Sequence, residues 1–253
     1  MIQRKILCQR RMLIAIMLFM ITGRATKSTQ PDRIDTAFTR MLGVRYPIIC
    51  APMFLVSNID MMVEVAEAGA IGVFPSLNFR PSNAFREALR EVRRRTTHAY
   101  GVNLIVHKSN ERMNADLQIC LEEKVPFIIT SLGSPQEVIQ KAHAIGTRVF
   151  CDVINLKHAL KVQSLGADGV IAVGSGAGGH AGAISPLVLI PWLKKHLSIP
   201  VVAAGGIASG SQLVATLALG ATAVSVGTRF IASMEATVDS SYKSAITSAY
   251  RKI

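Results

Sequence analysis

Short apolar runs alternate with longer amphipathic segments from residue 47 onward, and this alternation predicts strands followed by helices. Runs such as Val201-Val202-Ala203-Ala204 contain no polar residue, which is typical of strands buried on both faces of a parallel sheet. Between the runs, apolar residues recur three and four positions apart, the period of a helix with one buried face. We expect strands over residues 47–51, 70–74, 100–106, 127–130, 148–154, 169–173, 200–204 and 223–226, and helices over residues 58–68, 110–124, 135–144, 155–165, 186–196 and 209–219, with another helix opened by Pro81 and a last one within residues 235–250.

Four of the expected helices end in the same way, with a glycine that comes just before an apolar strand. These glycines are Gly69, Gly146, Gly166 and Gly220. A glycine just beyond a helix adopts the left-handed conformation that closes the helix and turns the chain back into the sheet. Eight strand-then-helix units in succession predict an α/β protein, a (β/α)8 TIM barrel. A doubly wound open sheet is the alternative.

The composition provides a large core and places much of the charge outside it. Half of the 253 residues are apolar. The formal net charge is +12, and six basic residues with no acidic residue lie within residues 1–31. A second basic run, residues 86–95, includes acidic residues and has the spacing of a solvated helix face. Few aromatic residues lie nearby to stack on bases, so we expect no nucleic-acid partner.

Residues 1–38 are interpreted as a basic and hydrophobic leader, or as an extension with no part in the function. Residues 12–21 are ten apolar residues after a basic start, which resembles a signal or targeting peptide. Ten residues are too few to span a bilayer, so we expect no stable membrane span. We therefore assign the barrel to residues 39–253 and expect a cytoplasmic protein, unless the leader acts as a targeting signal.

The four cysteines show neither a C-x-x-C pair nor a Cys/His ligand spacing. They are Cys8, Cys50, Cys120 and Cys151. We expect buried free thiols in a reducing compartment, with no metal site and no catalytic cysteine.

A glycine-rich stretch follows the strand expected over residues 169–173. It comprises Gly174-Ser175-Gly176-Ala177-Gly178-Gly179-His180-Ala181-Gly182. Because glycine loses much backbone entropy on ordering, such a run indicates a loop whose backbone comes close to a phosphate or a flat ring. The loop ends before Ser185-Pro186, a helix start, and His180 is its single ionisable side chain. The combination indicates an active site at the carboxyl end of a barrel strand.

Other candidate residues follow the remaining strands, and a barrel brings these strand ends to one face. Ala51-Pro52-Met53 forms a rigid turn that could back a planar ligand. Asn103, Thr130-Ser131 and Asp152 stand at or near the ends of the third, fourth and fifth strands. Gly205-Gly206 and Gly227-Thr228 follow the last two strands, where bare backbone N–H groups would bind a phosphate.

These stretches together resemble the nitronate monooxygenase (2-nitropropane dioxygenase) family of FMN-dependent barrels, over about residues 39–250. The resemblance rests on residues 47–53, Gly101-Val102-Asn103, Asp152-Val153-Ile154-Asn155, residues 176–182, Ala204-Gly205-Gly206-Ile207 and Gly227-Thr228-Arg229-Phe230. It implies an FMN held by Ala51, Pro52, Met53, Asn103, Gly178, Gly206, Gly227 and Thr228, to which we add Asp152, Gly179 and Gly205 as candidate contacts.

The resemblance also implies oxidative denitrification, in which an alkyl nitronate and O2 give a carbonyl compound and nitrite. Deprotonating a neutral nitroalkane needs a base whose pKa lies near the working pH, and His180 is the candidate. The nitro oxygens need hydrogen-bond donors, for which Ser175 and backbone N–H groups are candidates. The implied partners are a nitronate or nitroalkane and O2, and a homodimer is a candidate assembly.

The chain departs from the family pattern at several points. Some relatives carry Gln where Val173 and Ser225 stand, so polar contacts to the flavin would be fewer or different here. The family normally continues past the position of residue 253 with a covering segment, which implies a fragment or a shortened member with a more open flavin pocket. Two alternatives stay open, an FMN-dependent enoyl-acyl-carrier-protein reductase and an inactive flavin-binding barrel.

Overall fold

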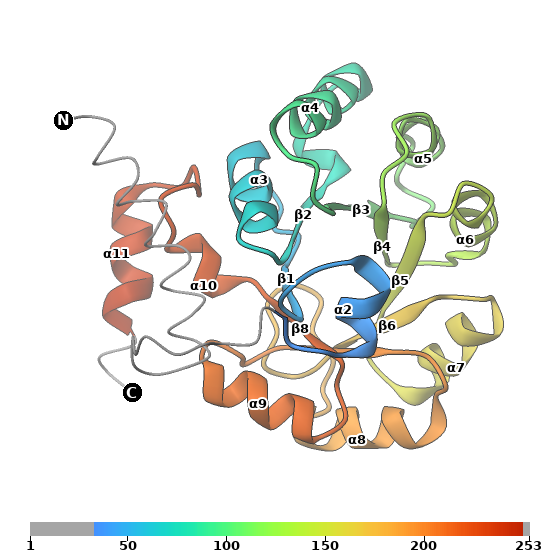
Figure 1. Ribbon diagram of the computed structural model, residues 1–253, viewed down its shortest axis with the longest axis vertical. Coiled ribbons are helices and arrows are strands. Elements are labelled where there is room, and N and C mark those ends of the chain that lie inside the picture. Colours follow the sequence, from blue (N-terminus) through green and yellow to red (C-terminus); the bar gives the residue numbers. More distant parts are fainter. Residues whose placement is uncertain (1–32, 250–253) are drawn as a thin grey trace.

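Eight parallel strands close into a barrel in the computed structural model, which describes residues 33–249 (Figure 1). The strands pair in chain order, and the last returns to the first. They are β1 (Ile48–Cys50), β2 (Ile71–Pro75), β3 (Gly101–Ile105), β4 (Phe127–Ser131), β5 (Arg148–Val153), β6 (Gly169–Val173), β7 (Val201–Ala204) and β8 (Ala223–Val226). Parallel neighbours in chain order need a crossover after every strand, and the closed ring confirms the expected (β/α)8 TIM barrel over the open sheet.

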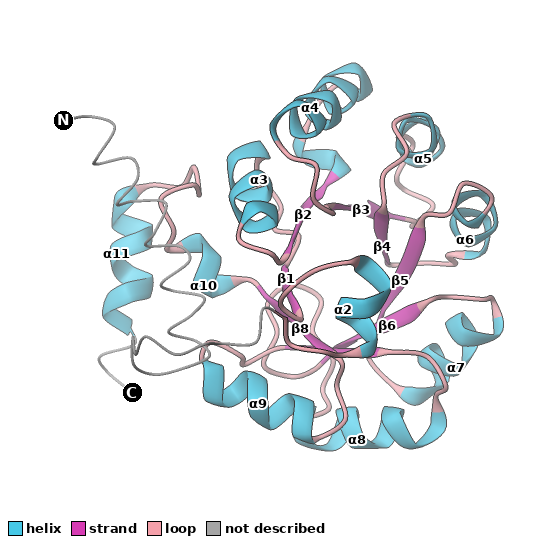
Figure 2. Ribbon diagram, viewed as in Figure 1, coloured by secondary structure: helices cyan, strands magenta, loops and turns pink. Residues whose placement is uncertain are grey.

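Helices surround the barrel and occupy the segments in which helices are expected (Figure 2). They are α2 (Ala37–Leu42), α3 (Ile59–Glu67), α4 (Ser82–Arg95), α5 (Met113–Glu122), α6 (Gln136–His143), α7 (Leu156–Ser164), α8 (Pro186–His196), α9 (Gly210–Ala218), α10 (Thr228–Ile231) and α11 (Ser240–Ala249), with a 3-10 turn η1 (Ser76–Asn78). The sequence did not predict α2 and α10, because elements this short are not revealed by a helical period.

The glycines expected to close helices have the predicted backbone conformation. Gly69, Gly146, Gly166 and Gly220 all have positive φ, from 81° at Gly146 to 103° at Gly220. Side chains other than hydrogen are strained in this region, so glycine is the residue that lets each helix end and the chain turn into the next strand.

The amino end of the barrel is closed by α2, whose Phe38 is fully buried. The Phe38 ring lies edge-on to the rings of Phe127 and Phe150, at centroid distances of 6.4 and 5.9 Å. Thr36 caps α2 by accepting a hydrogen bond from the backbone N–H of Thr39 at 3.1 Å. The packed barrel therefore starts before residue 39, and the boundary we placed there falls inside α2. The apolar stretch at residues 12–21 lies outside the described residues.

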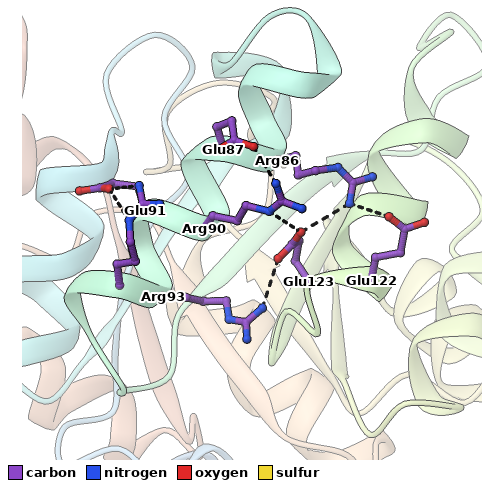
Figure 3. A network of polar contacts seen from close by, with 8 residues as sticks. Arg86, Glu87, Arg90, Glu91, Arg93, Glu122 and Glu123 are labelled. Atoms are coloured by element: carbon purple, nitrogen blue, oxygen red, sulfur yellow. Dashed lines mark hydrogen bonds and ion pairs between the residues drawn. The ribbon is translucent and has the colours of Figure 1, made fainter.

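Arginines of α4 form ion pairs with Glu123, at the end of α5, and so link the two helices (Figure 3). Glu123, whose side chain is only 8% exposed, accepts hydrogen bonds from Arg90 Nε at 3.0 Å and from Arg93 Nη1 at 3.2 Å. Arg86 lies 3.4 Å from the same carboxylate and 2.6 Å from Glu122. Arg90 and Arg93 are about half exposed, as a solvated helix face predicts, but their charge is matched by these carboxylates.

In residues 33–249, no helix is long and apolar enough to cross a membrane. Cys50, Cys120 and Cys151 are free and buried, as expected, whereas Cys8 lies outside the described residues. Burial raises the pKa of the Cys151 thiol to about 12. Since the thiolate is the reactive form, this thiol is unreactive near neutral pH.

Candidate active site

Two adjoining cavities open at the carboxyl ends of the strands, the face on which a barrel carries its site. The larger cavity, of about 1110 Å³, lies over the ends of β3, β4 and β5. The smaller cavity, of about 850 Å³, lies over the ends of β1, β7 and β8 and borders α11. Both are lined by Pro52, Asp152, Val173, Gly178 and Gly179, which we call the shared wall. Ligands bound in the two cavities would therefore meet along this wall.

Glycine backbone from two loops forms one side of the smaller cavity. Gly205 and Gly206 follow β7 with φ of 112° and 70°. The N–H of Gly206 donates to the carbonyl oxygen of Gly176 at 3.0 Å, and a Cβ on Gly205 would lie 2.6 Å from the backbone nitrogen of Ala177. Contact between the loops therefore requires glycine at position 205. At Gly206 a Cβ would meet no atom within 4 Å, and only the positive φ favours glycine. Because the Gly206 N–H is already bonded, it is not the bare anion donor that the sequence suggested.

Arg229 supplies positive charge to the smaller cavity. It comes two residues after Gly227, at the end of β8, and lines the cavity together with Thr228. It has no ion-pair partner among the residues that the structure describes. A guanidinium presents several donors in a geometry that matches phosphate oxygens. Arg229 and the neighbouring Thr228 hydroxyl together fit a phosphorylated ligand.

Hydrogen bonds to the side chains of Ser57 and Asn78 hold the turn after β1. Met53 donates its N–H to Ser57 Oγ at 2.9 Å, and its carbonyl oxygen accepts from Asn78 Nδ2 at 3.1 Å. Ala51 and Met53 line the smaller cavity, and Met53 Sδ lies 3.5 Å from where a Cβ on Gly227 would be. These hydrogen bonds hold the turn, which presents apolar atoms to the cavity.

Three polar side chains from adjacent strands form a hydrogen-bond chain in the larger cavity. Asn103 Nδ2 donates to Ser131 Oγ at 2.8 Å, and Ser131 donates to Asp152 Oδ2 at 2.5 Å. Asn103 Nδ2 also donates to the carbonyl oxygen of Ile129 at 3.2 Å, which fixes the orientation of its amide. Asn103 lines the larger cavity and not the smaller one, so the structure does not group it with the other expected cofactor contacts.

Burial raises the pKa of the Asp152 carboxyl to about 6, while the hydrogen bond from Ser131 acts in the opposite direction. Burial disfavours the charged carboxylate, whereas a donated hydrogen bond stabilises it. Asp152 therefore changes its charge near neutral pH. Carboxyl groups perturbed in this way and placed in a cleft are found at functional sites.

His180 lines the larger cavity from the glycine-rich loop after β6. Its side chain is exposed, and no hydrogen bond joins it to another residue within the described part of the chain. Gly179 has φ 69°, and a Cβ on it would meet no atom within 4 Å, so the loop is open here. His180 is available to a ligand without a partner that sets its tautomer. Ser175 of the same loop lines neither cavity, so the expected oxyanion donor is not brought to the site.

Most of the expected cofactor contacts come together. Ala51, Met53, Gly205, Gly206, Gly227 and Thr228 line the smaller cavity, and Pro52, Asp152, Gly178 and Gly179 belong to the shared wall. The sequence did not point to Tyr242, Ile246 and Thr247 of α11 in the smaller cavity, or to His158 and Lys161 of α7 in the larger one. These residues sit in ordinary amphipathic helices with no motif, and only their tertiary position brings them to the site.

Known proteins share both the sequence pattern and the fold. The family model described as nitronate monooxygenase matches residues 112–252. A Rhodococcus jostii protein named (3aS,4S,5R,7aS)-5-hydroxy-7a-methyl-1-oxo-octahydro-1H-indene-4-carboxyl-CoA dehydrogenase is 36% identical, over 83% of this chain and 59% of its own. A nitronate monooxygenase of Pseudomonas aeruginosa is 31% identical, over 83% of this chain and 72% of its own. This chain thus spans less than two thirds of the Rhodococcus relative.

Among solved structures, FabK from Thermotoga maritima superposes with a TM-score of 0.79 and 36% sequence identity. The superposition covers 83% of this chain and 67% of that chain.

Proposed function

Because this chain belongs to the nitronate monooxygenase family, we propose that it oxidises alkyl nitronates with FMN and O2 to a carbonyl compound and nitrite. The observation that carries the proposal is the shared wall between the smaller cavity, which Arg229 lines, and the larger cavity, which His180 lines. A cofactor ring on one side of this wall would face a substrate on the other side, in the cavity that His180 lines.

The smaller cavity suits FMN by size and by lining. Its volume of about 850 Å³ lies within the range of small-molecule sites. Thr228 and Arg229 would hold the phosphate, and Ala51 and Met53 would back the ring. When bound, FMN would supply the one-electron redox chemistry that the oxidation of a nitronate by O2 needs.

His180 is the candidate base for a neutral nitroalkane. Its imidazole would take up the proton that leaves the α-carbon, and the electron pair of the C–H bond would stay on the substrate as a nitronate. The exposure of the side chain lets it return the proton to water. A preformed nitronate needs no base, so comparing the two kinds of substrate isolates this step.

The absorption spectrum of the purified protein tests the cofactor, and nitrite release from propionate 3-nitronate tests the reaction. We expect His180→Asn to lower turnover of neutral nitroethane about 100-fold more than it lowers turnover of ethyl nitronate. His196→Asn is the control, because this ring lies at the surface of α8, where its Nδ1 donates to the carbonyl oxygen of Trp192 at 2.8 Å. A flavin-loaded protein that releases no nitrite from any nitronate overturns the proposal.

A second candidate function is oxidation or reduction of an acyl thioester, which the size of the larger cavity favours. About 1110 Å³ exceeds the usual volume of a small-ligand site and is more than a small nitroalkane fills. His158 and Lys161 line this cavity beside apolar side chains, a lining that suits an acyl chain with an anionic group. The Rhodococcus relative is named a carboxyl-CoA dehydrogenase. Rapid bleaching of the flavin by NADH without O2 would favour a reductase over the nitronate reaction.

A further inference from the structure

Asp152 is the only ionisable residue of the shared wall, among the residues that the structure describes. It lies in β5, where it pairs in register with Ile171 of β6. A side chain on a barrel strand is held more firmly than one on a loop. This distinguishes Asp152 from His180, which lies on the open glycine-rich loop and has no partner in the described protein.

The hydrogen-bond chain orients the Asp152 carboxyl and leaves one oxygen available. The carbonyl oxygen of Ile129 can only accept a hydrogen bond, so the amide nitrogen of Asn103, and not its oxygen, must face it. The same nitrogen also donates to Ser131 Oγ. The Ser131 proton is therefore directed to Asp152 Oδ2. Asp152 Oδ1 accepts no hydrogen bond from the described residues, and it is not fully buried. It is therefore accessible from the cavities that Asp152 lines.

The ionisable groups that line the two cavities with Asp152 come from four other segments, one of which is α11 with Tyr242. His180 lies on the loop after β6, and His158 and Lys161 lie on α7; all three line the larger cavity. Arg229 of α10 lines the smaller one. Burial raises the pKa of Asp152 to about 6, and within the described residues none of these groups forms an ion pair with it that would lower the pKa. The carboxylate is thus mostly ionised at neutral pH and yet basic enough to accept a proton.

We propose that Asp152 is a second proton acceptor of this site, which takes the α-hydrogen of a carbon-acid substrate at Oδ1, with Ser131 and Asn103 as positioning residues. The proposal rests on the proposed function for the identity of the substrate. The C–H bond breaks, an O–H bond forms at Asp152, and the electron pair stays on the substrate as a nitronate. The proton then passes through the exposed His180 to water at the open side of the cavity, so Asp152 and His180 act in succession and the step needs no oxidant or reductant.

Exchange of the α-hydrogens of nitroethane in D2O without O2, followed by NMR, measures this step apart from oxidation. In the flavin-loaded protein, we expect Asp152→Asn to slow the exchange by about 100-fold or more. Nitrite release from ethyl nitronate needs no base. In the same variant, its fold-decrease should be smaller than that of the exchange by a factor of about ten or more. Asp152→Glu keeps a carboxylate and should recover part of the exchange that Asp152→Asn loses.

The positioning role has its own readout, the pH profile of exchange. Ser131→Ala removes the hydrogen bond that lowers the pKa of Asp152, so the acid limb of the profile should move to higher pH. Ser131→Thr keeps a hydroxyl at this position and should keep the wild-type pH profile. The control is Ser198→Ala, because Ser198 precedes β7 at the opposite end of the barrel and bonds Gln163. This variant should leave the profile in place.

The outcomes separate the two proposals. A protein that exchanges nitroethane hydrogens through Asp152 but releases no nitrite from nitronates contradicts the proposed function and supports the proton acceptor. An Asp152→Asn variant that exchanges at the wild-type rate overturns the proton acceptor and leaves the proposed function standing. Wild-type protein that oxidises nitronates without catalysing exchange also overturns the proton acceptor.

Discussion

The backbone N–H of Gly206 donates to the carbonyl oxygen of Gly176 at 3.0 Å, and this bond ties the loop after β7 to the loop that carries His180. The carbonyl oxygen of Gly206 in turn accepts from Gln212 Nε2 of α9 at 2.9 Å. The first half of the glycine-rich loop is therefore anchored to the barrel. At Gly178 and Gly179, by contrast, a Cβ would meet no atom within 4 Å. Glycines of one loop thus serve two different needs, contact with a neighbouring loop and room beside a cavity.

Gly205→Ala should destabilise the flavin-free protein by about 1–3 kcal/mol, because φ of 112° is unfavourable for alanine. The added Cβ would also lie 2.6 Å from the Ala177 nitrogen. Urea unfolding measures the change. Gly178→Ala is the matched control, since its Cβ has open space and its φ is not in the left-handed region. Equal stability of the two variants would contradict this account of the loop contact.

Phe38→Ala should cost about 3–5 kcal/mol of unfolding free energy, the usual cost of removing a buried aromatic ring. The ring is fully buried against Phe127 and Phe150 at the amino end of the barrel. Phe54→Ala provides the comparison, because Phe54 is 53% exposed and should cost far less in the same urea titration. A small effect at Phe38 would mean that α2 is not part of the cooperative unit.

Asp152→Asn should stabilise the flavin-free protein at about pH 8 by up to about 3 kcal/mol. The folded protein binds this proton more tightly than the unfolded chain does, since burial raises the pKa of the carboxyl from 3.8 to about 6. In the wild type, this group therefore stabilises the fold below about pH 4, and its contribution is lost as the pH rises through about 6.

The difference between Asp152→Asn and wild type should accordingly shrink toward zero at about pH 4, where both side chains are neutral. Urea titrations at the two pH values measure it. A difference that does not change with pH would show that Asp152 does not titrate abnormally in the folded protein.

Glu123→Gln should lower the free energy of unfolding by about 1–3 kcal/mol, because it weakens charge-assisted hydrogen bonds from several arginines to one buried carboxylate. Glu137→Gln is the control, since its pair with Lys141 at 2.7 Å is half exposed on both sides. Exposed pairs of this kind contribute about 0.3–0.5 kcal/mol. Similar losses in both variants would mean that the network between α4 and α5 adds nothing beyond surface pairing.

The barrel could be predicted because its information is local. Uninterrupted apolar runs identify the strands, and Gly69 or Gly166 mark where helices end whatever lies around them. The role of α2 could not be predicted in this way. Its packing depends on Phe38 meeting Phe127 and Phe150, which are about 90 and 110 residues further along the chain, and no local pattern reports such a contact.

The site, too, has features that could be predicted from the sequence and features that could not. Ala51, Gly205 and Gly227, which the motifs single out, line one cavity, because barrel topology places every strand end on one face. The motifs could not show that Ser175 would line neither cavity, since the path of a glycine-rich loop is not set by a repeating pattern. Nor could they show that Asn103 and Asp152 are linked through Ser131, because that chain depends on the register of β3, β4 and β5.

The shared wall has a kinetic consequence. It consists mostly of glycine and short side chains, so a cofactor in the smaller cavity would itself complete the boundary of the larger one. The shape of the larger cavity that a substrate enters would then be set by the polypeptide and the cofactor together. Association should be ordered, with the cofactor entering first, and a seated substrate should delay the departure of the cofactor.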